Sequence, residues 1–260
     1  MIHPKFDLSG LPERPEKPRD CGITLMLDKG LPARQVEDMM ESCTDCVDLV
    51  KLGWGTAVIT PDLERKMAAY RDAGIPVYFG GTLFEAYYMR NRLDDYRSLL
   101  TEFGVGHVEV SDGTLEIEHE DKLEAIRLLA KDFTVVSEVG SKDMHKIMPP
   151  YIWVQKIEAE LEAGSWKVIC EARESGTAGV FRPSGEIRSG LIDEIIEHTP
   201  CEKLIFEAPK KSQQVWFLRH IGPNVNLGNI APDEVLPLET LRLGLRGDTL
   251  LDFCEADNIH

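Results

Sequence analysis

The chain has 260 residues, of which 29 are basic and 45 are acidic, so its formal net charge is −16. Hydrophobic residues make up 43% and aromatic residues 7%, close to the values of ordinary globular proteins, which excludes a disordered, collagen-like or membrane-spanning chain. The acidic balance also excludes duplex nucleic acid as a partner, because neutralising phosphates requires a clustered basic surface. A small anionic molecule would need a local basic pocket.

Residues 1–20 are expected to form an extended strap beside the folded domain. This segment contains four prolines and no apolar run long enough for a signal sequence or a membrane-spanning helix. Residues 21–260 hold no low-complexity linker, so we expect one domain there. The strap is a candidate contact in a homo-oligomer.

From Cys21 onward, short β-rich runs alternate with longer segments of helical period. The predicted strands are Gly22–Leu27, Val47–Leu52, Val77–Phe79, His107–Val110, Thr134–Glu138, Lys167–Glu171, Lys203–Glu207 and Val225–Leu227. The predicted helices are Ala33–Cys43, Pro61–Ala73, Leu93–Phe103, Glu120–Lys131, Tyr151–Ala163, Leu191–Glu197, Ser212–His220 and Leu238–Leu243. Strict alternation implies parallel strands with right-handed crossovers, and eight such units predict an α/β fold of the (β/α)8 TIM barrel type. An open doubly wound sheet is the alternative.

Four successive predicted strands carry a glutamate at or next to their carboxyl end, namely Glu109, Glu138, Glu171 and Glu207. In a parallel barrel the chemistry gathers at the carboxyl ends of the strands. Burying an unpaired carboxylate costs several kcal/mol, so a cation must face this ring. Mg²⁺ suits it because the ion prefers hard oxygen ligands. We predict Glu109, Glu138 and Glu171, together with Asp112, as metal ligands; structural salt bridges are the alternative.

Basic side chains follow the same strands and would face the same end of the barrel. They are Lys29, Lys51, Lys142 and Arg173. Together they favour recognition of a small polyanion, with Arg173 offering a planar fork to a carboxylate or phosphate. The alternative for a single lysine is a solvated surface position. Lys51 fits a surface position least well, because the apolar residues Val50 and Leu52 of its predicted strand flank it.

Barrels commonly hold phosphate in the loops after the seventh and eighth strands. Here those loops contain Lys211 and Asn229, beside further amide and hydroxyl donors. The predicted substrate-binding residues are Lys211, Asn229, Lys29, Ser111 and Ser175. Ser175 lacks the Gly-x-Ser-x-Gly context of a serine hydrolase, so a nucleophilic role for it is disfavoured.

The six cysteines are scattered along the chain. Their spacing matches neither a disulfide framework nor a zinc ribbon, and the Cys43 and Cys46 pair lacks a second pair of ligands. We therefore expect reduced thiols in a cytoplasmic protein.

Several strings of residues at these strand ends resemble the phosphosulfolactate synthase family, which has bacterial and plant heat-stress-associated relatives. The match covers roughly Cys21 to Thr249. The strings are 27–32 (LDKGLP), 50–56 (VKLGWGT), 80–85 (GGTLFE), 109–113 (EVSDG), 173–176 (RESG), 206–209 (FEAP), 211–214 (KSQQ) and 243–249 (LGLRGDT). The resemblance implies a Mg²⁺-dependent lyase-class barrel enzyme that adds sulfite to phosphoenolpyruvate, giving (2R)-phospho-3-sulfolactate. In methanogens this reaction opens coenzyme M biosynthesis.

The resemblance also implies a mechanism. Sulfite attacks C3, the electrons move into the carboxylate to give a metal-stabilised aci-carboxylate, and C2 is then protonated. Lys142 resembles the family's general acid, and Lys51 and Arg173 are the other predicted catalytic residues. The alternatives are a non-catalytic stress-associated barrel protein and a lyase that forms a Schiff base on Lys51 or Lys142.

Overall fold

The computed structural model describes residues 5–140 and 148–253. Eight parallel strands form one sheet in the order β3-β2-β1-β8-β7-β6-β5-β4, and the two end strands, β3 and β4, contact each other. The strands are β1 (Thr24–Asp28), β2 (Leu49–Leu52), β3 (Val77–Phe79), β4 (His107–Val110), β5 (Thr134–Val139), β6 (Ser165–Cys170), β7 (Leu204–Glu207) and β8 (Leu227–Ile230). Because the first and last strands of the chain, β1 and β8, pair with each other and the end strands β3 and β4 are in contact, the sheet closes into a barrel. The predicted (β/α)8 barrel is confirmed, and the open sheet is excluded.

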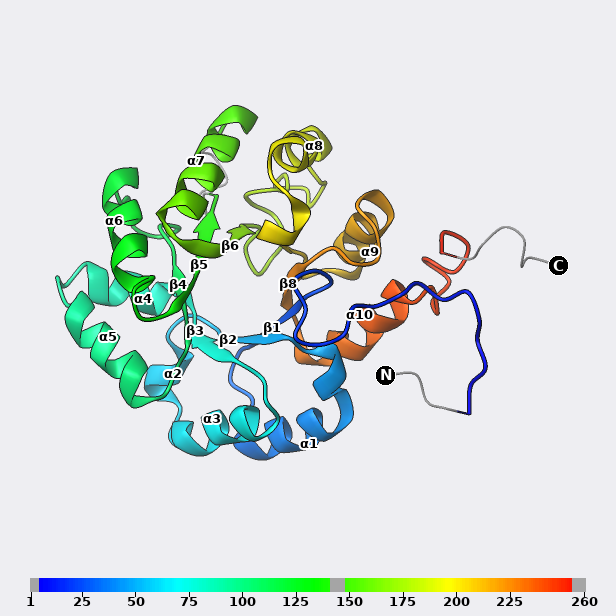
Figure 1. Cartoon of the computed structure of the whole chain (residues 1–260), viewed down its shortest axis with the longest axis horizontal. Coiled ribbons are helices and arrows are strands. Elements are labelled where there is room, and N and C mark those ends of the chain that lie inside the picture. Colours follow the sequence, from blue (N-terminus) through cyan, green and yellow to red (C-terminus); the bar gives the residue numbers. More distant parts are fainter. Residues whose placement is uncertain (1–4, 141–147, 254–260) are drawn as a thin grey trace.

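Helices follow the strands and surround the ring of strands on the outside (Figure 1). They are α1 (Ala33–Cys43), α2 (Thr56–Ile59), α3 (Leu63–Asp72), α4 (Gly81–Tyr88), α5 (Leu93–Glu102), α6 (His119–Leu129), α7 (Pro150–Ala163), α8 (Ser189–His198), α9 (Lys211–His220) and α10 (Val235–Arg242). No helix in the described part of the chain is both long and apolar enough to cross a membrane.

The strands are buried on both faces, which explains their nearly continuous apolar sequences. Every residue of β1, β2 and β7 is buried, since one face packs against the outer helices and the other fills the barrel. The charged residues in these strands stand near their carboxyl ends, as Asp28, Lys51 and Glu207 do. Burial of the strands therefore carries these side chains into the interior of one end of the barrel.

Several predicted element ends differ from the structure by two or three residues, and the last strand and two helices differ in ways that bear on the site. β8 spans Leu227–Ile230, two residues beyond the predicted start, so Asn229 belongs to the strand. The Gly228-Asn229 pair is typical of a turn. Here Gly228 allows β8 to pack closely against Ile205 of β7, because a Cβ on this glycine would lie 3.1 Å from Ile205 Cγ2. Helices α2 and α4 were not predicted, since each begins in a glycine-rich stretch.

Residues 5–20 contain no helix or strand and lie against the amino ends of the strands. Arg14 Nε forms an ion pair of 2.8 Å with Glu239 Oε1 of α10, and Arg19 Nε forms one of 2.8 Å with Asp48 Oδ1, just before β2. In Figure 1 this dark-blue segment runs past α10. It thus lies at the end of the barrel opposite the strand-end carboxylates.

Candidate active site

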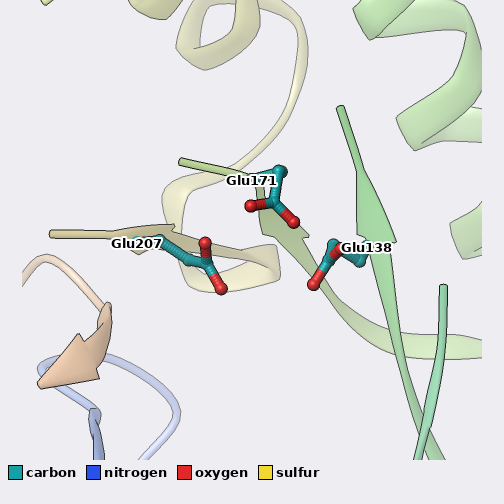
Figure 2. A group of neighbouring side chains, drawn as sticks. All are labelled: Glu138, Glu171 and Glu207. Carbon is teal, nitrogen blue, oxygen red and sulfur yellow. The ribbon is translucent and has the colours of Figure 1, made fainter. Parts of the chain in front are cut away.

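Three buried glutamates converge at the carboxyl ends of neighbouring strands. Glu138 belongs to β5, Glu171 directly follows β6, and Glu207 ends β7. One carboxylate oxygen from each lies within 4.8 Å of the other two. Figure 2 shows the three carboxyl groups gathered around one space. All three line a cavity of about 470 Å³ at this end of the barrel.

The ammonium group of Lys51 lies among the strand-end carboxylates. Its Nζ is 2.9 Å from Glu109 Oε2, 3.5 Å from Glu207 Oε1 and 3.6 Å from Glu138 Oε2. Burial acts to lower the pKa of Lys51, but the negative charges of Glu109 and Glu207 outweigh it and raise that pKa well above its ordinary value. Lys51 is therefore a fixed positive charge in the cavity.

Glu109 is the direct counter-ion of Lys51, and other donors fix its carboxylate. Tyr78 of β3 donates its hydroxyl to Oε2 at 2.9 Å, and the backbone N–H of Gly81, at the start of α4, donates to Oε1 at 2.6 Å. Burial, followed by the negative charge of Glu109, raises the pKa of Tyr78 well above its usual range. The phenol therefore remains a donor, and both oxygens of Glu109 are engaged.

Glu207 is held more loosely at the edge of the same cluster. Its Oε2 accepts the backbone N–H of Ala172 at 2.9 Å. Burial raises the pKa of Glu207, Lys51 opposes this rise, and the nearby carboxylate of Glu138 adds to it. This crowding of buried negative charges is the condition under which a bound cation is favourable.

The backbone around Glu171 is shaped to bring its carboxylate into the cavity. Arg173 has a φ of 57°, and its N–H donates to Glu171 Oε1. Gly140 directly follows β5 with a φ of +137°, and a Cβ there would lie 2.6 Å from Glu171 Cβ. Glycine at this position therefore allows the end of β5 to approach Glu171 closely.

The cavity lining is negative. Among the described residues it carries five carboxylates and two cationic side chains, an excess of three negative charges. The expected basic pocket is thus not supplied by these side chains. Buried carboxylate oxygens that point into one space form a donor set that fits a hard divalent cation. Glu138, Glu171 and Glu207 are the residues that could hold it.

Seven of the predicted site residues line this cavity: Lys51, Glu109, Glu138, Glu171, Arg173, Ser175 and Asn229. Asn229 has a φ of 55°, and its buried Oδ1 accepts no hydrogen bond from the described residues. Lys142, the predicted general acid, lies outside the described residues.

Two predicted substrate-binding lysines do not line the cavity. Lys29 Nζ forms an exposed ion pair of 2.7 Å with Glu174 Oε1, whose residue does line it. Lys211 Nζ forms an exposed ion pair of 3.0 Å with Asp248 Oδ2. Both lysines are thus occupied by carboxylates at the rim.

Ser111 and Asp112 also lie away from the cavity lining. Ser111 is buried and donates to Glu85 Oε1 at 2.7 Å. Asp112 Oδ1 lies 2.9 Å from Lys122 Nζ, which is in turn 2.7 Å from Glu160 Oε1. The structure therefore places Asp112 in a second buried ion cluster and not with the glutamates, because the buried ammonium of Lys122 on α6 binds its carboxylate.

Some lining residues were not predicted as site residues. Glu207 stands at the carboxyl end of its strand, and the other three glutamates lie within one residue of the ends of theirs, so the same sequence signal applies to it. Trp54, in the loop after β2, lines the cavity as well. Thr82 and Thr114 also line it, and nothing in their local sequence marks them.

A (β/α)8 barrel whose strand ends gather buried carboxylates and a lysine around one cavity is the architecture of an enzyme that acts on a small polar molecule. The profile of the family described as (2R)-phospho-3-sulfolactate synthase (ComA) matches residues 12–248. The chain belongs to the phosphosulfolactate synthase family of lyase-class enzymes, so the resemblance in its sequence is confirmed.

Individual relatives agree with this assignment. The phosphosulfolactate synthase of Bacillus subtilis is 43% identical over 242 residues, which cover 92% of this chain and 96% of the relative. That of Methanocaldococcus jannaschii is 46% identical over 88% of this chain and 93% of its own. Protein HEAT-STRESS-ASSOCIATED 32 of Arabidopsis thaliana is 25% identical over 88% of each chain.

Among solved structures, the 3-hexulose-6-phosphate synthase of Salmonella typhimurium superposes with a TM-score of 0.56 at 13% identity. The superposition covers 86% of this chain and 100% of that one. This likeness concerns the barrel fold.

Proposed function

We propose that the protein adds sulfite to phosphoenolpyruvate and forms (2R)-phospho-3-sulfolactate. The observation that carries the proposal is the buried cluster of Lys51 with Glu109, Glu138 and Glu207 at the mouth of the barrel, in a chain of this family. The product would feed sulfonate biosynthesis, which in methanogens is the route to coenzyme M.

Mg²⁺ is the proposed cofactor, with Glu138, Glu171 and Glu207 as the residues that would hold it. This set differs from the one predicted from the sequence, because Glu109 is engaged by Lys51 and Asp112 by Lys122. An anionic substrate entering a cavity with excess negative charge requires such a cation. When bound, the ion supplies Lewis-acid stabilisation of negative charge.

The proposed reaction proceeds in two steps. The sulfur lone pair of sulfite forms a bond to C3, and the C2–C3 π electrons move into the carboxylate, which then carries two negative charges on its oxygens. A proton is then added to C2. Lys51, held in place by its carboxylate partners, contributes a preorganised positive charge near this developing charge. Arg173 at the rim offers donors to an incoming anion, and Lys142 remains the proposed proton donor.

The Schiff-base alternative is disfavoured for Lys51. Imine formation requires a neutral amine, whereas this ammonium group lies within ion-pair distance of three carboxylates that raise its pKa. Borohydride in the presence of a carbonyl substrate would trap an imine if one formed. We expect no covalent adduct by mass spectrometry.

The proposal is tested by incubating the purified protein with phosphoenolpyruvate, sulfite and Mg²⁺ and detecting phosphosulfolactate by mass spectrometry. Glu207→Gln is expected to reduce the rate by about 100-fold or more, because a charge-stabilising group of the site is lost. The matched control is Glu239→Gln, a buried glutamate that pairs with Arg14 and lies outside the cavity lining. Lys142→Ala tests the proton donor.

The outcomes distinguish the enzyme from a non-catalytic stress-associated barrel. Product that requires Mg²⁺, with Glu239→Gln active and Glu207→Gln inactive, supports the proposal. A folded wild-type protein that forms no product under these conditions would favour the non-catalytic alternative.

A further inference from the structure

The loop after β2 holds a tryptophan in a backbone conformation that normally belongs to glycine. Trp54 has a φ of 52°. The N–H of Thr56 donates to the carbonyl of Gly53 at 3.0 Å, so residues 53–56 form a tight turn with Trp54 at its first central position. Gly55, the second central residue, has a φ of −106° and a ψ of 20°. Turns with positive φ at the first central position alone are dominated by glycine there.

The turn requires one residue with a positive φ, and neither of the two glycines beside Trp54 supplies it. Neither Gly53 nor Gly55 has a positive φ, whereas the bulky residue between them does. Asparagine and aspartate tolerate this conformation because of their short polar side chains, but a tryptophan does not gain that benefit. The local sequence therefore places the strain on the one residue of the turn that has a large side chain.

Packing keeps the turn in place. The N–H of Gly53 donates to the carbonyl of Asp28, at the end of β1, at 2.8 Å, and Thr56 Oγ1 donates to the Gly53 carbonyl at 2.8 Å. On the other side, a Cβ on Gly80 would lie only 2.8 Å from the Trp54 nitrogen. These contacts fix the direction in which the indole leaves the backbone.

Strained residues gather at the cavity. Four non-glycine residues in the ranges 5–140 and 148–253 have a positive φ, and Trp54, Arg173 and Asn229 among them line the cavity. The fourth, Asn91, lies in an exposed turn after α4. Such conformations persist at functional sites because the side chain they position is needed there.

We propose that Trp54 is a substrate-contacting residue, whose indole covers phosphoenolpyruvate at the mouth of the cavity and excludes water from its reacting carbons. Its side chain lines the cavity yet remains 41% exposed without a ligand, so the ring has apolar surface to cover a bound molecule. Excluding water strengthens the charge interactions below it. The inference rests on the proposed function, since it names the same substrate.

The test compares Trp54→Gly, Trp54→Phe and the matched control Asn91→Gly. Glycine removes the ring and relieves the backbone, phenylalanine keeps an aromatic ring in the same backbone conformation, and the control relieves a positive φ away from the cavity. Phosphoenolpyruvate binding in the presence of Mg²⁺ is measured by calorimetry and by tryptophan fluorescence, the KM by turnover with sulfite, and the unfolding midpoint by heating.

Trp54→Gly is expected to weaken binding and raise the KM by about tenfold while unfolding at or above the wild-type temperature. Trp54→Phe should recover most of the affinity and lose the substrate-dependent fluorescence change. Asn91→Gly should bind as the wild type does. A merely structural tryptophan would instead give a less stable Trp54→Gly with unchanged KM, and this result overturns the inference.

Other outcomes separate the role of Trp54 from the proposed reaction. Normal wild-type turnover with an unchanged KM in Trp54→Gly refutes the role of Trp54 and leaves the reaction intact. Binding that depends on Trp54 without product formation supports the contact and refutes the reaction. Absence of phosphoenolpyruvate binding to the wild type refutes both. A changed sedimentation coefficient with unchanged KM assigns Trp54, with exposed Val58 and Ile59 nearby in the chain, to a contact between copies instead.

Discussion

Replacement of Lys51 by methionine takes one ammonium group out of a cluster of buried carboxylates while keeping much of the side-chain volume. At an effective dielectric constant of about 20, a charge pair 2.9 Å apart attracts by about 6 kcal/mol and one 3.5 Å apart by about 5 kcal/mol. Desolvation of the charges offsets most of this attraction. The net loss on leaving the buried carboxylates without their partner is about 3–5 kcal/mol.

In a domain of this size such a loss lowers the unfolding temperature by roughly 10 °C. The assay is chemical and thermal unfolding of the metal-free protein, followed by a titration with Mg²⁺. We expect Mg²⁺ to stabilise Lys51→Met more than the wild type, because the excess of negative charge in the cavity has grown by one. Activity should be lost although the cation binds.

The matched control is Lys211→Met, which removes a lysine from an exposed ion pair with Asp248. Pairs of this kind contribute about 1 kcal/mol or less. Equal stability of Lys51→Met and the wild type, or weaker stabilisation of this variant by Mg²⁺, would refute the reasoning about the buried charges.

Three further predictions concern groups around the barrel. Burial lowers the pKa of His107 below its ordinary value of 6.5, so near and below pH 6.5 the unfolded chain binds more protons than the folded one. The free energy of unfolding should therefore fall as the pH drops below 6.5. Urea unfolding at about pH 7.5 and about pH 5 should show a smaller fall for His107→Gln than for the wild type. Lys122→Met removes the donor that lies 2.6 Å from the Glu138 carbonyl oxygen, and it should lower the free energy of unfolding, measured in urea, by about 3–5 kcal/mol. A loss below about 1 kcal/mol would contradict this prediction. Glu174→Gln frees Lys29 and removes one negative charge from the lining, so steady-state kinetics should give a lower KM for phosphoenolpyruvate at low salt and nearly unchanged stability; a raised KM would contradict this.

The barrel and the ring of glutamates could be predicted because both depend on local order along the chain. Apolar strands alternate with helical segments, and a glutamate at the end of a buried strand must enter the barrel mouth whatever its partners are. Glu109, Glu138 and Glu171 follow from this rule, and Glu207 follows equally.

The pairing of charges could not be predicted in this way. Asp112 stands directly after a strand, like a ligand, yet Lys122 on α6 binds it, and nothing in the spacing of the two residues distinguishes this pair. Lys29 follows β1 but pairs with Glu174 across the rim. Such contacts depend on how the barrel closes, because its closure sets the distances between loops that are far apart in sequence.

The central claim is that strand-end carboxylates hold a divalent cation and thereby make a negative cavity accept a negative substrate. Calorimetric titration of phosphoenolpyruvate into the metal-free and the Mg²⁺-loaded protein tests it most directly. We predict binding only with Mg²⁺, and loss of that binding in Glu207→Gln. Equally tight binding of phosphoenolpyruvate without Mg²⁺ would contradict the account.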